Sequence, residues 1–295
     1  MHASRPRRSV LYRLGDDPGS YADAHAQPVD VLLFDLEDSV APVDKAAARA
    51  RLAAALAAGG FADREVLVRV NGLDTPWGED DIAAIAALAV DGVMLAKAED
   101  AAQLRAVDAA IRARRSGGLA LWAMIETPRG VLAAAAIGAS CPAMAGLAIG
   151  LGDLSRGLGG FRHAAPFRFP VLAALSQVVL AARAFGLAAI DSSFRDARDR
   201  EGFRRACLES RELGYDGKAL TDPALAPIAD LAFSPDAAEL AWAARVAAAC
   251  AAAAPGTQPV VDGQLIEPGY AQVAARIAAT RAWRRPAEIP PTSIQ

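Results

Sequence analysis

Short apolar runs alternate with alanine-rich segments along most of this 295-residue chain. The runs are apolar at consecutive positions, which is typical of parallel strands buried on both faces. We expect strands at residues 9–14, 29–34, 65–70, 92–96, 119–125, 147–151, 187–190 and 217–220. The segments between them are rich in strong helix formers, so we expect helices at residues 44–58, 78–89, 101–115 and 170–185.

This alternation of eight strands with helices predicts an α/β fold, a (β/α)8 TIM barrel. A doubly wound open parallel sheet gives the same alternation and is the alternative. We expect the barrel domain to span residues 7–224 and a C-terminal helical extension to span residues 225–285. The extension has two helical stretches, near residues 236–254 and 269–284, joined by a loop rich in Pro and Gly.

Composition excludes several classes of protein. The formal net charge of −3 argues against a nucleic-acid-binding protein, which needs a basic face. The three cysteines are widely spaced, which predicts reduced thiols. Residues 131–152 carry no charge, but they are rich in Ala and Gly and contain a Cys-Pro break, so we expect a buried helix followed by a buried strand rather than a membrane span. The basic N-terminus leads into no apolar segment, and we expect a cytoplasmic protein.

Polar and charged residues stand at the ends of the expected strands. The active sites of TIM barrels lie at the carboxyl ends of the strands, so these side chains should face one mouth. In chain order they are Asp35, Glu37, Asp38, Arg69, Asn71, Lys97, Glu126, Asp153, Asp191 and Asp222. For Asp191 and Asp222, a helix-capping role is equally open.

Glu126 and Asp153 follow neighbouring strands, so their carboxylates can converge. Two carboxylates completed by water and substrate oxygens suit Mg²⁺, although two capping carboxylates that never meet remain the alternative. Zinc is disfavoured because the chain lacks a cluster of Cys or paired His. His2, His25 and His163 all lie away from the strand ends, which disfavours histidine-based acid–base chemistry.

Arg69 follows three apolar residues of a strand that should be deeply buried. A guanidinium cannot lose its proton, so it must be paired or face a ligand cavity. It could stabilise a developing oxyanion, or form an internal salt bridge to Glu37 or Asp38, and the two roles are compatible.

Motifs carried by these residues resemble a known family. In chain order they read VLLFDLEDSVAPVDKAAAR, VLVRVNG, GVMLAKAED, MIETPRG, GLGDLSRGLG, AAIDSSFRD, ELGYDGKALTDP and VVDGQLIEP. This order resembles the citrate lyase β-subunit-like branch of the HpcH/HpaI aldolase/citrate lyase family, over nearly the whole chain.

The resemblance implies a (β/α)8 barrel in a homo-oligomer, a trimer or its multiple, with the C-terminal segment packed on a neighbouring subunit. It implies a lyase dependent on Mg²⁺, with Mn²⁺ as the alternative. The reaction would cleave or form a carbon–carbon bond in a 3-hydroxyacyl-CoA, such as malyl-CoA, citramalyl-CoA or a citryl thioester, by retro-Claisen or aldol chemistry. The partners would be a 2-oxo acid and an acyl-CoA.

Carried over by motif, Glu126 and Asp153 resemble the metal ligands of this family. Arg69 resembles the residue that contacts substrate oxygens and the enolate. Lys97 matches the position of a strand-end lysine, although Ala96 replaces the preceding proline. We expect Arg69, Lys97 and Asn71 to bind substrate.

Glu37 and Asp38 line the same site in this comparison and are candidates for the catalytic base, with a metal-bound hydroxide as a third. The aldolase branch typically has a histidine after the strand-two glutamate. Here that residue is Asp38, which favours the lyase branch.

Three departures leave the substrate open. Leu14 replaces a proline, residues 16–28 lack a lysine often found there, and Asp222 replaces a histidine. If these elements shape the thioester side, the chain could instead be a thioesterase on such a CoA ester, or an aldolase on a free hydroxy-oxo acid. A non-catalytic metabolite-binding subunit is the third hypothesis.

Overall fold

The computed structural model describes residues 5–15, 17–61, 64–159, 168–194, 196–254 and 256–282. The chain divides into two compact units. One comprises Arg7–Phe233, and the other comprises Ser234–Gln295 together with Met1–Pro6. The domain boundary expected after residue 224, and the packing of the extension on a neighbouring subunit, stay predictions.

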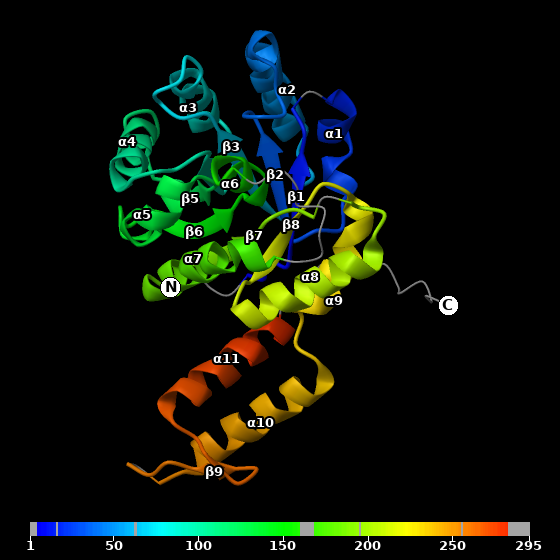
Figure 1. Cartoon of the computed structure of the whole chain (residues 1–295), viewed down its shortest axis with the longest axis vertical. Coiled ribbons are helices and arrows are strands. Elements are labelled where there is room, and N and C mark those ends of the chain that lie inside the picture. Colours follow the sequence, from blue (N-terminus) through cyan, green and yellow to red (C-terminus); the bar gives the residue numbers. More distant parts are fainter. Residues whose placement is uncertain are drawn as a thin grey trace. The chain divides into compact units, whose positions relative to one another are not determined.

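The larger unit is a closed barrel of parallel strands in the order β1-β2-β3-β4-β5-β6-β7-β8 (Figure 1). Closure between β8 and β1 confirms the TIM barrel and rules out the open sheet. The strands are β1 Ser9–Arg13, β2 Val31–Asp35, β3 Glu65–Val70, β4 Gly92–Leu95, β5 Ala120–Ile125, β6 Met144–Ile149, β7 Ala188–Asp191 and β8 Gly217–Leu220.

Helices follow the strands and surround the barrel (Figure 1). They are α1 Pro18–Ala22, α2 Lys45–Ala58, α3 Gly78–Ala86, α4 Ala101–Arg112, α5 Pro128–Gly138, α6 Leu151–Gly157, α7 Leu172–Ala184, α8 Arg200–Leu213 and α9 Ala226–Phe233. Several start at sequence-encoded caps. Asp100 and Gln103 form a capping box at α4, and Thr127 caps α5 with Pro128 in the first helical turn.

The barrel interior is filled by alternate residues of the strands. They are Val10, Val31, Leu33, Leu67, Met94, Trp122, Met124, Ala145, Ala148 and Ile190. The intervening residues, such as Leu32 and Val68, pack outward in the core that includes the surrounding helices. Because side chains alternate along a strand, the inward series continues two residues further to Asp35, Arg69 and Glu126. The pleat itself therefore aims three charged side chains at the mouth.

Strand β6 begins at Met144, three residues before the predicted start at 147. Residues 144–146, Met-Ala-Gly, carry only a weak strand signal because glycine is unfavourable in strands. A Cβ built on Gly146 would lie 2.1 Å from the ring of Trp122, so the large interior tryptophan requires a glycine opposite it. The uncharged stretch is a helix, α5, followed by the buried strand β6, as predicted. Within the described part of the chain, no helix is both long and apolar enough to cross a bilayer.

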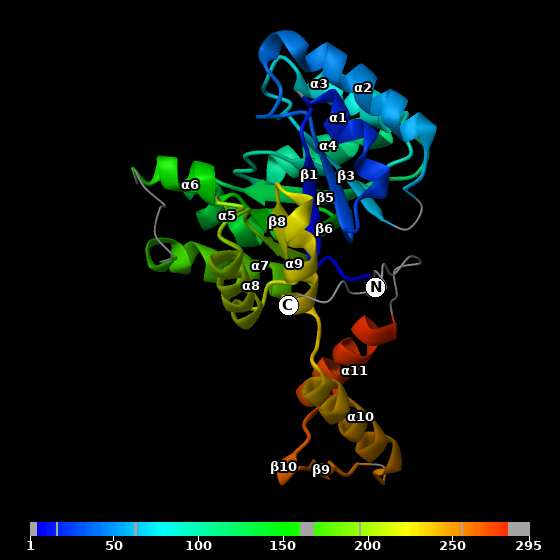
Figure 2. The ribbon, with the colours of Figure 1, turned by 90° about the vertical axis from the view of Figure 1, so that its right-hand side faces the viewer.

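In the smaller unit, α10 (Ala237–Ala252) and α11 (Pro268–Ala282) lie side by side (Figure 2). The loop predicted between them contains a short antiparallel hairpin, β9 (Val260–Val261) and β10 (Gln264–Leu265). Asp262 and Gly263 form its two-residue turn, both with positive φ. An Asp-Gly pair is a strong hairpin signal, so this element was readable from the sequence.

A buried ion cluster lies between β7, β8 and α8, centred on Asp191 at the carboxyl end of β7. Asp191 accepts hydrogen bonds from Lys218, from Arg168 at 2.5 Å and from Ser210 at 2.6 Å. The pKa of Asp191 is lowered: burial would raise it, but the charges of Lys218 and Arg168 outweigh burial. Asp191 is therefore a structural anion, whereas Asp222 caps a short helical turn by accepting from the amide of Ala224 at 2.8 Å.

We predict that Asp191→Asn will lower the free energy of unfolding by about 3–5 kcal/mol, because it leaves Lys218 and Arg168 buried without their counter-charge. Urea unfolding followed by circular dichroism measures this. Asp108→Asn is the control, since it breaks only the exposed pair to Arg112 and should leave the urea midpoint unchanged. Equal midpoints for all three proteins would contradict the structural role of Asp191.

Candidate active site

A cavity of about 340 Å³ opens at the carboxyl ends of the strands. Its floor is apolar, with Val10, Leu33, Met94 and Met124. Its polar lining comprises Tyr12, Asp35, Asp38, Ser39, Arg69, Glu126, Asp153, Arg156, Asp191, Ser192, Ser193 and Thr221. Six of the ten strand-end residues expected at the mouth line this cavity, namely Asp35, Asp38, Arg69, Glu126, Asp153 and Asp191.

Arg69 and Asp35 form the central contact of this site. They are directly paired in the register of β2 and β3, and both point inward. The guanidinium donates two hydrogen bonds of 2.7 Å, from Nε and Nη2, to the two carboxylate oxygens. The ring of Tyr12 lies 5.1 Å from the guanidinium carbon of Arg69. Glu37 or Asp38 was the expected salt-bridge partner of Arg69; Asp35 is the closer partner, and Glu37 lies 3.3 Å from the guanidinium.

Asp35 also organises the loop that follows β2. Its carboxylate accepts hydrogen bonds from the backbone amides of Glu37 at 2.9 Å and Ser39 at 3.1 Å. Burial works against the charged form, but the hydrogen bonds and charge of Arg69 lower the pKa of Asp35. Asp35 stays ionised and fixes the course of the loop that carries Glu37 and Asp38.

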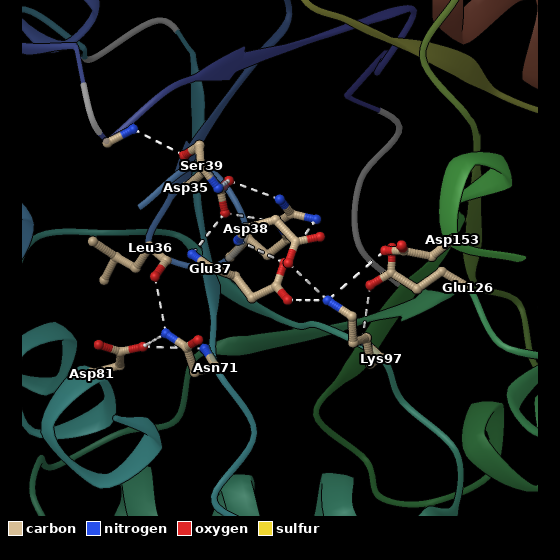
Figure 3. A network of polar contacts seen from close by, with 12 residues as sticks. Asp35, Leu36, Glu37, Asp38, Ser39, Asn71, Asp81, Lys97, Glu126 and Asp153 are labelled. Carbon is tan, nitrogen blue, oxygen red and sulfur yellow. Dashed lines mark hydrogen bonds and ion pairs between the residues drawn. The ribbon is translucent and has the colours of Figure 1, made fainter. Parts of the chain in front are cut away.

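Lys97 bridges the acidic side chains of the mouth (Figure 3). Its ammonium donates to Glu37 and, at 3.0 Å, to Asp38, and it lies 3.8 Å from Asp153. Its backbone has a φ of +49°, a conformation that costs energy for a residue other than glycine. Strain of this kind is characteristic of functional sites, and here it directs the lysine between three carboxylates.

Glu37 and Asp38 have pKa values shifted in opposite directions. Burial raises the pKa of Glu37, and Arg69 and Lys97 only partly oppose it. Burial is also the largest single influence on Asp38, but the contacts with Glu37 and Lys97 outweigh it and lower the pKa. Two adjacent carboxyls with divergent pKa values are suited to holding and passing on a proton.

Glu126 is almost completely buried, with 3% of its surface exposed. It accepts a 3.0 Å hydrogen bond from the backbone amide of Lys97. Burial raises the pKa of Glu126 to about 7, against the lowering influence of the Arg69 charge. Gly150 makes room for it, because a Cβ at that position would lie 2.5 Å from a Glu126 carboxylate oxygen.

Asp153 lies in the first turn of α6, beside Glu126 (Figure 3). Its carboxylate pairs with Arg156, one turn further along the helix, whose side chain is largely exposed at the rim. Glu126 and Asp153 line the same cavity, and their joint binding of a metal stays a prediction. In the described segments, no group of three or more acidic, His or Cys side chains could hold a metal.

These donors fit Mg²⁺, which commonly takes one or two carboxylates and completes its shell with water and substrate oxygens. The buried Glu126 carboxyl, whose pKa burial raises despite the charges of Arg69 and Lys97, also fits a site that takes up a cation. Glu126 and Asp153 are thus the residues that could hold the metal.

Asn71 is turned away from the cavity. Its side-chain amide donates to the carbonyl of Leu36 at 2.9 Å and to Asp81 at 2.6 Å, and its oxygen accepts from Lys45 at 3.1 Å. Its assignment to substrate binding stays a prediction. His25 lies in a short turn at Ala24–Ala26, away from the described site, whereas His2 and His163 lie outside the described residues.

Asp35 is expected at the mouth from its strand-end position, but its pairing with Arg69 was not predicted. Two further residues, Arg156 and Lys45, were not singled out from the sequence. Arg156 was readable as the i+3 partner of Asp153 on a helix. Lys45 had no signal beyond its place in the DLEDSVAPVDK motif.

Residues 8–223 match the HpcH/HpaI aldolase/citrate lyase family. A (3S)-malyl-CoA thioesterase of Cereibacter sphaeroides is 40% identical over 268 residues, which cover 90% of this chain and 91% of that protein. CitE from Mycobacterium tuberculosis, in complex with magnesium, acetoacetate and coenzyme A, has a TM-score of 0.77 and 31% identity over 96% of this chain and all of that one. The M. tuberculosis citrate lyase β subunit with oxaloacetate and magnesium has a TM-score of 0.68 and 32% identity over 80% of this chain and all of that one.

We predict that Mg²⁺ will bind more weakly as the pH falls below 7. The pKa of Glu126 is raised to about 7, so below that pH the proton must be displaced before the carboxylate can bind a cation. The apparent affinity should fall by up to about tenfold per pH unit below 7 and level off above it. Isothermal titration with MgCl2 between pH 5.5 and 8.5 measures this.

Glu126→Gln is the control for this titration. It keeps the size of the side chain but removes the titrating group, so its residual Mg²⁺ affinity should lack the rise up to pH 7. A wild-type affinity that does not change across this pH range would contradict the assignment.

Proposed function

Because this chain belongs to the HpcH/HpaI aldolase/citrate lyase family, we propose that it is a magnesium-dependent carbon–carbon lyase acting on a 3-hydroxyacyl-CoA, such as malyl-CoA, citramalyl-CoA or a citryl thioester. The observation that carries the proposal is the pairing, in one cavity, of a carboxylate pair (Glu126, Asp153) with a buried guanidinium (Arg69). The carboxylate pair could bind a hydroxy acid through a metal cation. The guanidinium could stabilise the negative oxygen of an enolate.

Glu126 and Asp153 would hold the ion. When bound, Mg²⁺, or Mn²⁺ in its place, supplies a Lewis acid that polarises substrate oxygens and lowers the pKa of the substrate hydroxyl. The chain contributes the buried Glu126, the Asp153 beside it and the space left by Gly150.

Arg69 is the candidate for stabilising the leaving carbanion. Cleavage of the carbon–carbon bond pushes its electron pair into the thioester, which becomes an enolate with a negative oxygen. Arg69 faces the cavity and is held rigid by Asp35 beneath and Tyr12 alongside. A preorganised cation of this kind stabilises charge as it develops and needs no rearrangement during the reaction.

The Glu37–Asp38 pair is the candidate for proton transfer. Asp38 lines the cavity and can reach the substrate hydroxyl, while Glu37 lies behind it against Arg69 and Lys97. Burial raises the pKa of Glu37, which favours its holding a proton that it could exchange with Asp38. Lys97 joins the two carboxyls and supplies the third charge at this side of the mouth.

The molecules named with the relatives support this class of substrate. Magnesium accompanies acetoacetate and coenzyme A in one CitE complex, and oxaloacetate in another. After cleavage, a hydroxyacyl-CoA lyase would hold a 2-oxo acid and an acyl-CoA, and oxaloacetate in one complex and coenzyme A in the other correspond in chemical class to these two halves.

The second candidate is a thioesterase, favoured by the 40% identity to the (3S)-malyl-CoA thioesterase. Water would attack the thioester carbonyl, and the same Arg69 would stabilise the tetrahedral oxyanion. The two reactions would use the same residues but break different bonds: the lyase breaks a carbon–carbon bond, and the thioesterase breaks the thioester bond. We also propose, by family analogy, a cytoplasmic homo-oligomer, a trimer or its multiple.

Product analysis separates the two reactions. With malyl-CoA and Mg²⁺, a lyase should yield acetyl-CoA and glyoxylate, whereas a thioesterase should yield free coenzyme A and intact malate. We predict acetyl-CoA and glyoxylate, detected by liquid chromatography and by the phenylhydrazone of glyoxylate. Free thiol with the carbon skeleton intact would establish the thioesterase, and no product from malyl-, citramalyl- or citryl-CoA would contradict both.

We predict that Arg69→Lys will lower kcat by about 10²–10³-fold, because a lysine cannot pair with Asp35 through two bonds and also face the enolate oxygen. Mg²⁺ affinity should change little, since Glu126 and Asp153 are untouched. Steady-state kinetics and metal titration on the same preparation measure both. An unchanged kcat would remove Arg69 from the reaction.

A further inference from the structure

Lys45, at the start of α2, is a buried charge that the proposed reaction does not use. Its side chain is 4% exposed, yet in the described part of the chain it makes no ion pair with a carboxylate. Its ammonium instead points at the loop after β2. Burying an ammonium is costly unless its hydrogen bonds are replaced, so its partners show what it is for.

All three N–H groups of Lys45 are used. They donate to the backbone carbonyls of Leu36 and Glu37, both at 2.7 Å, and to the side-chain oxygen of Asn71 at 3.1 Å. The ammonium also lies 5.1 Å from the centre of the Trp77 ring. An ammonium has three donors and no acceptor, so this site is saturated and specific for lysine.

Asn71 completes the grip on the same loop. Its amide donates to the Leu36 carbonyl, and Asp81 at the start of α3 orients that amide (Figure 3). Asp81 is fixed in turn by Arg49 at 2.8 Å. Lys45 of α2 and Asn71, directly after β3, therefore converge on two carbonyls of one loop, and Asp81 of α3 holds Asn71 in place.

The loop is thus held from two sides. Asp35 binds its amides, at Glu37 and Ser39, while Lys45 binds its carbonyls, at Leu36 and Glu37. Between these two holds the peptide units around Glu37 have little freedom to rotate. From this loop Asp38 lines the cavity, while the adjacent Glu37 contacts Arg69 and Lys97.

Lysine is rare in this protein, which makes its position informative. Of the 31 basic residues only Lys45, Lys97 and Lys218 are lysines, and the others are arginines. Two of the three are buried, and the third bridges the carboxylates of the mouth. Arginine supplies the positive charge elsewhere in the chain. Lysine occurs at positions where a compact ammonium with three hydrogen-bond donors is needed.

We propose that Lys45 is a positioning residue for the reaction: by holding the carbonyls of Leu36 and Glu37, it keeps the Glu37 and Asp38 carboxyls in place for proton transfer. This inference rests on the proposed function for its catalytic consequence, but the hold on the loop is a property of the protein without substrate. The two can therefore be tested separately.

The test compares wild type with Lys45→Met, which keeps the length of the side chain and removes its three donors. Amide hydrogen exchange, read by mass spectrometry on the free protein, should be faster in peptides covering residues 36–40. Lys218→Met is the matched control: it also removes a buried lysine, but one that contacts Asp191 of β7 and not the loop after β2. In that variant, exchange at residues 36–40 should match wild type.

Kinetics on the same proteins test the catalytic part. Lys45→Met should lower kcat by about 10- to 100-fold, because small displacements of catalytic groups cost this much. Mg²⁺ affinity should stay within about twofold of wild type, since Glu126 and Asp153 have no contact with Lys45. If the methionine variant fails to fold, Lys45→Arg carries the test, since it keeps the charge but cannot satisfy the same three acceptors.

Unchanged exchange at residues 36–40, or a kcat equal to wild type in a folded variant, would overturn the inference. If wild type cleaves none of the three thioesters, the proposed function falls, while the exchange measurement still decides whether Lys45 holds the loop. If wild type is active and Lys45→Met is equally active, the inference falls and the proposed function stands.

Discussion

The ion pair between Asp35 and Arg69 is the contact on which the rest of the site depends. Both side chains are buried, both follow the inward parity of adjacent strands, and two hydrogen bonds of 2.7 Å join them. Neither charge is tolerable there alone, since a buried ion without its partner costs several kcal/mol. Asp35 also accepts hydrogen bonds from the loop that carries Glu37 and Asp38. The Asp35–Arg69 pair therefore fixes both the Arg69 guanidinium and the course of the loop that bears the two carboxyls.

Negative charge exceeds positive charge around this pair. The cavity and its immediate surroundings hold Asp35, Glu37, Asp38, Glu126 and Asp153 against Arg69, Lys97 and, at the rim, Arg156. Within this excess of negative charge, Glu126 is the carboxyl that most readily holds a proton, because burial raises its pKa to about 7. A divalent cation at Glu126 and Asp153 would relieve it, which links the electrostatics of the mouth to a metal-dependent activity.

Much of this could be predicted from the sequence, because a parallel barrel fixes where strand ends meet. The eight apolar runs gave the barrel, and the residues after them gave Arg69, Glu126 and Asp153 at one cavity. What escaped prediction depends on partners that are distant in the sequence. Asn71 follows β3 as expected, but its amide turns toward Leu36 and Asp81, a contact that no local spacing reveals. The glycine that weakens the strand signal at the start of β6 is likewise explained by a distant partner, because Trp122 of the neighbouring strand leaves no room for a Cβ at position 146.

The central claim is that the carboxylate pair and Arg69 form one binding site for a metal ion and an oxo acid. Its most direct test is calorimetric titration of the protein with glyoxylate, pyruvate and oxaloacetate, each with and without Mg²⁺, in wild type and Glu126→Ala. The account predicts that at least one of the three acids binds only with Mg²⁺ present, and that the substitution abolishes this binding. Equal affinity for the acids with and without Mg²⁺, or metal-dependent binding that persists in Glu126→Ala, would contradict a shared site for the metal and the acid.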